Sequence, residues 1–361
     1  MFSQTPVATS NLIAVNRFVR KHFVHLISLL ALLAFLTPGV SQKVRAHRAG
    51  PLDASSLSLF LMMLSAAIQC GFRAFRAVVA RPKPLLVCLV QFFVVLPVAC
   101  WVVGQLCVPL LGRELGEPIQ IGIDLVMLMP VAATATIWVR DTKGDIELLV
   151  SLVIITMSLG TLIAPTYLYF MSDLTANSIV IPRVLILKNL ALGVFTPLVI
   201  GMTLNKVLRT RLPRVQPYFS FAGNVGLFMA VFLNVGTASP LLRHLSLHQV
   251  AFAILIVLAV NATNFVLGSA VGRVVGLGRD HQVTCEFSSG MRSNGTALVV
   301  GLASFPNTPL VTVPAAIYII FQHLLAGIVR SRLVKRLGDG ETAVTAAPAT
   351  AATTTGAARA A

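Results

Sequence analysis

Residues 286–296 carry ionisable and hydrogen-bonding side chains inside a stretch that is otherwise long and apolar enough to cross a membrane. A second polar segment follows Pro130. Hydroxyl, amide and carboxylate oxygens are hard ligands, which replace the water shell of a small cation. We therefore predict an ion-binding site at Thr134, Thr136, Glu286, Ser288, Ser289 and Asn294, with Thr136, Glu286 and Ser289 as the candidate sodium ligands.

Arg292 is the unusual member of this segment, because a guanidinium is costly at membrane depth. Three interpretations are open. Arg292 pairs with Glu286 or Asp124, or it grips a substrate carboxylate or sulfonate bidentately, or its fixed charge takes the place of one coupling cation. The predicted substrate-binding residues are Arg292, Asn294, Thr296 and Pro130.

The composition indicates which elements hold these residues. Of 361 residues, 56% are hydrophobic and only 11% are charged, and the mean hydropathy is +0.86, so the chain reads as a polytopic membrane protein. The net charge of +16 comes from short Lys/Arg clusters between apolar runs, a pattern that sets topology and does not favour nucleic acid. No metal-binding cysteine spacing and no nucleotide or hydrolase motif is present, so we expect neither an enzyme nor a cofactor.

Ten apolar runs are long enough to cross a bilayer. They cover residues 23–38, 57–72, 84–111, 119–139, 148–171, 184–204, 219–238, 250–275, 283–305 and 310–329. An N-terminus on the cytoplasmic side places 19 Lys and Arg residues in cytoplasmic segments and 7 on the opposite side. This excess predicts an integral protein of the plasma (cell inner) membrane with both termini in the cytoplasm.

Ten spans divide into five plus five, which predicts an inverted repeat with interrupted helices at equivalent positions. The fourth span contains Pro130 and the ninth contains Gly290 and Gly295, so each has a reason to break. We expect a cytoplasmic tail over 1–21, repeats over 22–171 and 172–336, and a disordered tail over 337–361, where Ala and Thr dominate. Two facing breaks would form a polar cavity near the midplane.

The order of several short motifs resembles the bile acid:sodium symporter family over residues 20–335. These motifs are Gln91-Phe92 with Pro97, Pro130 to Thr136, Lys143-Gly144-Asp145, the run from Thr161 to Pro165, Thr196 to Gly201, Glu286 to Ala297 and Phe321 to Gly327. The resemblance implies ten helices, two of them broken and crossing, and a panel domain that moves against a core domain. It also implies two sodium sites behind the crossing and an organic anion in front of it.

Some positions depart from the family pattern. The Ser-Asn pair of the fourth span falls on Ala135 and Thr136, and the fifth-span Ser and Thr fall on Leu149 and Val153. In the ninth span the family shows Glu-x-Gly-x-Gln-Asn. Alignment on the Gly places Arg292 at the Gln, whereas alignment on the Glu places Gly290 there. The sodium sites implied by the resemblance are therefore incomplete in this chain.

We predict a sodium-coupled secondary transporter of an organic anion that works by alternating access around a midplane site. One alternative is a cation/proton antiporter of similar fold that uses Glu286. Another is a sodium-independent anion transporter in which Arg292 replaces a coupling ion. The expected partners are the lipid bilayer, a small organic anion and Na⁺. The sequence does not determine the oligomeric state, and a monomer is compatible with it. No residue code in the sequence identifies the substrate.

Overall fold

The computed structural model describes residues 7–46, 48–49, 52–69, 82–174 and 178–345. Within these residues the chain is helical, apart from a short antiparallel pair formed by β1 (Arg48–Ala49) and β2 (Leu52–Asp53). An apolar chain in lipid must satisfy its backbone hydrogen bonds internally, and helices do so within a single segment. The prediction of an all-helical fold is confirmed.

The helices of the first half follow the predicted apolar runs closely. They are α1 (Val7–Lys21), α2 (Phe23–Leu36), α3 (Pro38–Ala46), α4 (Ala54–Ala67), α6 (Pro82–Val90), η1 (Gln91–Val95), α7 (Leu96–Gly104), α8 (Cys107–Leu111), α9 (Arg113–Leu128), α10 (Ala135–Asp141) and α11 (Ile146–Leu174).

The second half contains long helices and one interrupted pair. Its elements are α12 (Arg183–Leu190), η2 (Ala191–Phe195), α13 (Thr196–Val207), α14 (Leu212–Leu242), α15 (Leu247–Val274), α16 (Arg279–Gly290), α17 (Asn294–Ser304), η3 (Pro309–Thr312) and α18 (Val313–Thr345). The helix α18 continues through 337–345, where we had expected a disordered tail. Residues 346–361 of that predicted tail lie outside the described part of the chain.

Six of the described helices are individually long and apolar enough to cross a membrane. They are Pro82–Leu111, Ile146–Leu174, Arg183–Val207, Leu212–Pro240, Leu247–Val274 and Pro309–Lys335, and they match the third, fifth, sixth, seventh, eighth and tenth predicted spans. A seventh candidate is the pair His25–Leu36 and Pro38–Ala46, which bends by 93°. Of the remaining predicted spans, the second is the short helix α4, and residues 70–72 of that span lie outside the described residues.

Two of these long helices contain a π-helical turn directly before a proline. The turn η1 precedes Pro97, and η2 precedes Pro197. Proline lacks the amide proton that an α-helix uses and its ring crowds the preceding turn, so a widened turn is the local response. The η1 turn carries Gln91 and Phe92 into the protein interior, where both are buried.

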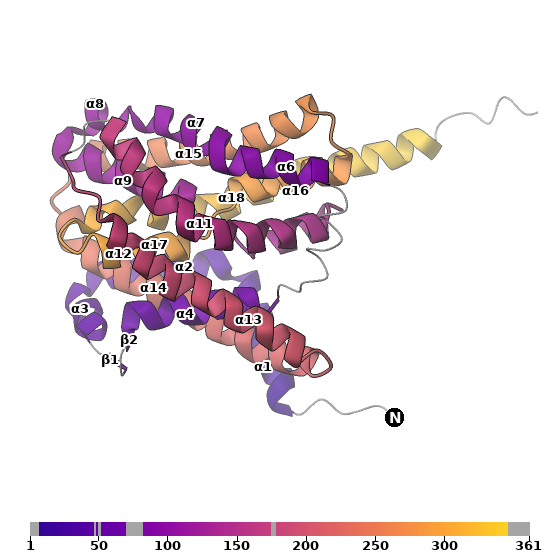
Figure 1. The fold of residues 1–361 in the computed structure, drawn as a ribbon, viewed down its shortest axis with the longest axis horizontal. Coiled ribbons are helices and arrows are strands. Elements are labelled where there is room, and N and C mark those ends of the chain that lie inside the picture. The colour runs from indigo at the N-terminus through magenta and orange to yellow at the C-terminus, as the bar shows by residue number, and fades with distance from the viewer. Residues whose placement is uncertain (1–6, 47, 50–51, 70–81, 175–177, 346–361) are drawn as a thin grey trace, which may run out of the picture.

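The helices form two groups (Figure 1). The first group is α1 to α4 with α12 to α14, and α14 packs along α4, α2 and α3. The second group is α6 to α11 with α15, α16 and α18, in which α15 packs against α16, α18 and α7. The helix α17 lies between them and contacts α14, α4 and α12 on one side and α18 and α9 on the other.

Candidate functional site

The fourth predicted span is broken between α9 and α10. Met129 is extended, with φ −74° and ψ 148°, as expected for a residue that precedes proline. Pro130 cannot continue the α9 hydrogen-bond ladder because it has no amide proton. The chain resumes a helix only at Ala135, so residues 129–134 cross the protein interior without helical hydrogen bonding.

The ninth predicted span is broken between α16 and α17. Met291 is extended, with φ −111° and ψ 107°, directly after α16 ends at Gly290. A Cβ atom on Gly290 would lie 2.4 Å from the ring of Phe265, so only glycine fits against this aromatic side chain. Met291 and Arg292 of this break are both 0% exposed, and Ser293 is half-buried.

The two breaks meet and share backbone hydrogen bonds. Val131 and Arg292 form an antiparallel bridge. Ala132 N donates to Met291 O at 3.0 Å, and Ser293 N donates to Pro130 O at 2.9 Å. An unwound backbone at membrane depth is stable only where protein groups satisfy it, and here each break satisfies the other. We call this arrangement the crossing.

Two side chains complete the hydrogen bonding of the crossing. Gln322 Oε1 accepts from Arg292 N at 3.0 Å, and Thr156 Oγ1 accepts from Val131 N at 3.2 Å. Both residues are buried. Gln322 belongs to the Phe321 to Gly327 motif, but neither Gln322 nor Thr156 was predicted as a site residue. The only sequence feature that could have predicted them as site residues is a single amide or hydroxyl side chain within an apolar helix.

We expect Gln322→Leu to destabilise the crossing, because it leaves the buried Arg292 amide without an acceptor. An unsatisfied buried donor costs about 1–3 kcal/mol. Thermal unfolding of the purified protein in detergent measures this loss. Gln322→Glu retains an acceptor oxygen and serves as the matched control. A melting temperature of Gln322→Leu equal to that of wild type would show that the hydrogen bond contributes nothing.

Arg292 lies between α16 and α17, with its guanidinium carbon 4.0 Å from the centre of the Phe92 ring. Within the described residues it pairs with no acidic side chain, and none of its three side-chain nitrogens has a hydrogen-bond partner. A desolvated cation–π contact is worth about 2 kcal/mol, which is less than the several kcal/mol that burial of a charge costs. Further compensation must come from the surroundings of the crossing.

The predicted pairing of Arg292 with Glu286 is wrong. Glu286 instead pairs with Arg332 of α18 through Oε1 and Nη2. Glu286 lies on the face of α16 that α15 approaches, and a Cβ on Gly268 of α15 would be 2.7 Å from the Cα of Glu286. The predicted pairing of Arg292 with Asp124 is also absent, because neither the guanidinium nitrogens nor Asp124 Oδ2 has a hydrogen-bond partner.

Gly295 and Thr296, which follow Asn294, face the first helix group. A Cβ on Gly295 would lie 2.4 Å from Met62 Sδ of α4, and the Thr296 hydroxyl lies 3.6 Å from Met63 Sδ. Asn294 is 1% exposed, yet neither its amide nitrogen nor its amide oxygen has a partner. The start of α17 thus presents an unsatisfied amide between the two groups.

The predicted hydroxyl ligands lie on α10 and α16. Trp138 stacks on Phe287 with ring centres 6.5 Å apart. Because the Val131–Arg292 bridge fixes the two chains antiparallel, Thr136 and Ser289 come to similar levels. Ser288 and Ser289 both donate to Cys285 O, at 3.1 and 2.7 Å, and Thr136 donates to Ala133 O at 2.7 Å. Thr134 is exposed.

Helix ends give the crossing opposite electrostatic sides. The helices α9 and α16 both end there, so the partial negative charges of their C-termini favour a cation. The helix α17 begins there, and its N-terminal amides favour an anion. Arg292 follows the α16 terminus directly, and this position supplies part of the missing compensation for its charge.

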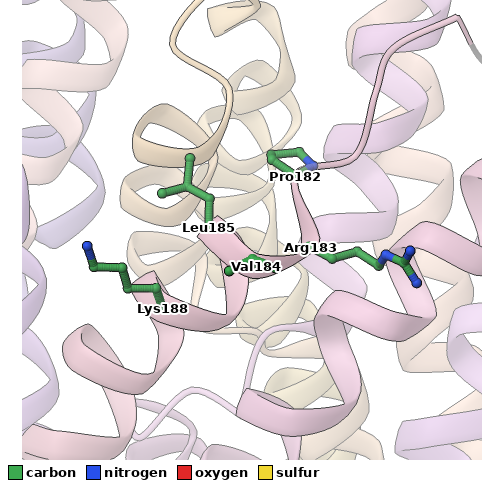
Figure 2. Close-up of a pocket in the computed structure, with 5 residues that line it drawn as sticks. All are labelled: Pro182, Arg183, Val184, Leu185 and Lys188. Atoms are coloured by element: carbon green, nitrogen blue, oxygen red, sulfur yellow. The ribbon is translucent and has the colours of Figure 1, made fainter.

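A separate surface depression lies away from the crossing. It encloses about 440 Å³ and is lined by the first turns of α12, from Pro182 to Lys188 (Figure 2). Its wall is largely apolar, and its charged members, Arg183 and Lys188, point outward from the helix. The guanidinium of Arg183 lies 3.7 Å from the centre of the Tyr169 ring. No predicted site residue lines this depression.

Apolar helices of membrane length, wrapped around two broken and crossed segments, define an integral membrane protein. A family profile described as the sodium bile acid symporter family matches residues 56–245, which is more than half of the 361 residues. The chain belongs to this family of transporters. It is similar to an uncharacterized protein, YbaS, of Bacillus subtilis (strain 168), with 24% identity over 264 residues, or 73% of this chain and 82% of that protein.

Proposed function

We propose that this protein is a sodium-coupled secondary transporter of an organic anion, working by alternating access around the crossing. Family membership supports a transporter. The observation that carries the proposal is the crossing itself, where two breaks satisfy each other's backbone while Arg292 and Asn294 keep unsatisfied buried groups. Buried polar groups without protein partners mark a place where another molecule completes the hydrogen bonding.

The anion binds between the two helix groups at the start of α17. Asn294 supplies an unpartnered amide there, and Thr296 and Pro130 complete the proposed contact set. The α17 N-terminus favours a carboxylate or sulfonate by its dipole and free amides. Since α17 contacts both groups, movement of one group against the other would expose this position to each side of the membrane in turn.

The cation side of the crossing is the α10–α16 side. We propose Thr136, Ser289 and Glu286 as sodium ligands, with Thr134, Ser288 and Asn294 as further oxygen donors. Arg292 lies behind the crossing in the second helix group, against Phe92. This position favours a fixed charge in place of one coupling cation over a clamp on the anion.

The proposed architecture extends the fold described above. It has ten spans, arranged as five-helix repeats over 22–171 and 172–336, with the first helix group as panel and the second as core. The fourth and ninth spans occupy equivalent positions in the two repeats, and their breaks meet. We propose a monomer in the plasma (cell inner) membrane with both termini in the cytoplasm, as the Lys/Arg distribution favours.

Thermal unfolding against a panel of organic anions tests the function. A ligand that binds only the folded state raises its melting temperature by RT ln(1 + [L]/Kd), about 2.7 kcal/mol at a hundredfold excess over Kd. We expect at least one carboxylate or sulfonate to stabilise the protein, and to do so more strongly in sodium than in choline. No stabilisation by any anion in either salt would contradict the proposal.

We expect Glu286→Gln to abolish sodium-stimulated uptake while the protein still inserts and folds. The substitution removes the carboxylate charge from the cation side and also weakens the contact with Arg332. Uptake into proteoliposomes, with and without sodium, measures the effect. Arg332→Gln is the comparison, because it breaks the same contact and retains the carboxylate. Sodium-stimulated uptake by Glu286→Gln at the wild-type rate would refute the role of Glu286.

One observation favours a sodium-independent anion transporter as the second candidate. The carboxylate of Glu286 is engaged by Arg332, and Arg292 already places a positive charge at the crossing. Two guanidinium groups then replace the coupling ions. Stabilisation by an anion that is equal in sodium and choline would select this candidate.

A further inference from the structure

Among the buried polar side chains of the second helix group that have atoms without a hydrogen-bond partner in the described part of the chain, three lie on α9 and α15. They are Gln120 and Asp124 on α9 and Asn261 on α15, with 1%, 4% and 0% exposure. The unpartnered atoms are Gln120 Nε2, Asp124 Oδ2 and both amide atoms of Asn261. Nothing in the proposed transport mechanism uses them. We call these three residues the Asp124 cluster.

Close contacts between α9 and the preceding span fix the level of Asp124. A Cβ on Gly104 would lie 3.4 Å from Gln120 Cγ, and one on Gly116 would lie 2.6 Å from the Cα of Val108. The two segments therefore run antiparallel, with Gly104 opposite Gln120. One turn further, Cys100 comes opposite Asp124.

Contacts of the same span with α15 bring Asn261 to this place. Cys100 Sγ donates to Asn264 Oδ1 at 3.1 Å, and Asn264 Nδ2 lies 3.1 Å from Met127 Sδ of α9. Asn261 precedes Asn264 by three residues on α15, so the two side chains lie on the same face, one turn apart. Asp124 and Met127 have the same relation on α9.

Asn261 lies beyond Asn264 in the same direction as Asp124 lies beyond Met127 only if α9 and α15 are parallel. The following contacts show that these two helices are parallel. Cys285 Sγ donates to Gln91 Oε1 at 2.9 Å, and Cys285 O faces Gly268 of α15. Residue numbers along the third span therefore rise, from Gln91 to Cys100, as those along α15 fall, from Gly268 to Asn264. The third span is antiparallel to both helices, so Asn261 and Asp124 lie at one level.

Charge compensation for Asp124 is missing at this level. Arg292 stacks on Phe92, and its guanidinium nitrogens make no hydrogen bond with Asp124. Of the other titratable groups around Asp124, Tyr318 OH donates to Gly290 O at 3.1 Å and accepts from Asn264 Nδ2 at 2.9 Å. Cys100 Sγ donates to Asn264 Oδ1, and Cys107 and Tyr167 are neutral neighbours of the Asp124 carboxyl. A buried carboxylate without a donor or cation is strongly disfavoured.

We propose that Asp124, Gln120 and Asn261 bind a monovalent cation. The Asp124 carboxylate and the Asn261 amide oxygen are hard ligands, and a half-turn of the Gln120 amide puts its oxygen where the unpartnered Nε2 lies. Together they form a singly charged ligand set, which suits one small cation with water completing the shell. Asp124 and Gln120 lie on α9, whereas the proposed sodium ligands Thr136, Ser289 and Glu286 lie on α10 and α16. The site is therefore separate from the sodium set and does not depend on it. The cation is either Na⁺ or a proton, and the two titrations described next distinguish them.

Thermal unfolding of the purified full-length protein tests the site without any transport assay. Wild type, Asp124→Asn and Glu114→Gln are titrated with NaCl against choline chloride at constant ionic strength, and separately with pH in sodium-free buffer. Glu114 is the matched control because it is an exposed carboxylate in the first turn of the same helix. Asn261→Ala is the second variant and leaves the carboxylate in place.

We expect sodium to raise the melting temperature of Asp124→Asn less than that of wild type and Glu114→Gln, because only the sodium ligands at the crossing remain in that variant. We expect Asn261→Ala to require about tenfold more sodium for the part of the shift that Asp124 contributes, the equivalent of about 1.4 kcal/mol. If the proton is the cation, the same contrast appears in the pH titration and not in the sodium titration. Identical sodium and pH responses of wild type and both cluster variants would overturn the proposal, since ordered water would then suffice. If Asp124→Asn fails to fold, the response of Asn261→Ala decides alone.

Discussion

Arg292→Gln is expected to make transport depend more steeply on sodium. Glutamine removes the fixed charge beside Phe92 and supplies an oxygen, so about one more sodium ion per anion binds at the crossing. At low sodium the uptake rate then falls about tenfold, since the lost charge must be replaced from solution at a cost of about 1.4 kcal/mol. High sodium restores the rate. Initial uptake rates across a sodium series measure both effects.

Arg292→Lys separates charge from shape in the same experiment. Lysine keeps the positive charge but lacks the planar guanidinium that stacks on Phe92, so the sodium dependence stays as in wild type. A raised half-saturating anion concentration with unchanged sodium dependence in Arg292→Gln would mean that the residue clamps the anion. No change in either quantity would mean that its role is structural only.

Gly268→Ala is expected to be strongly destabilising. Its Cβ would lie 2.7 Å from the Cα of Glu286 and 2.9 Å from Cys285 O, and backbone atoms cannot move aside as a flexible side chain can. Overpacking of this kind costs about 1–3 kcal/mol. Because α16 must shift away from α15, sodium-stimulated uptake falls together with the melting temperature.

Gly272→Ala on the same helix is the matched control for Gly268→Ala. Its Cβ would meet only Gln282, at 3.3 Å or more. Both substitutions gain the same helix propensity, about 1 kcal/mol, so the difference between their unfolding free energies reports the close contact alone. Equal stability of the two variants would contradict the packing of α15 on α16.

Much of this architecture was predictable from the length of the apolar runs and from the residues that interrupt helices, proline and glycine. The described parts of the ten predicted runs are mainly helical, and the spans with Pro130 and Gly290 break where those residues stand. Both signals are local: a run of apolar residues needs a helix in lipid, and proline cannot continue one. The structure does not test the count of ten spans or the repeat.

The contacts of the site residues were not predictable, because they depend on helix rotation. Glu286 and Arg292 are near in sequence, yet one faces α18 and the other faces Phe92. The break between them removes the helical register that would relate their directions. Gln322 and Asp124 were not predicted as site residues for a similar reason. A single polar residue in an apolar run does not indicate which neighbouring helix its side chain contacts.

The proposed transport mechanism requires the two breaks to meet at the crossing, and Ala132→Pro disrupts this meeting. Proline removes the N–H that donates to Met291 O, and the extended backbone of a bridge residue tolerates a following proline. Ala132→Ser retains the N–H and is the control. The measurement is accumulation of a stabilising anion in proteoliposomes under an inward sodium gradient. We expect wild type and Ala132→Ser to concentrate the anion above its external level and Ala132→Pro to fail. Equal accumulation by Ala132→Pro would contradict the account.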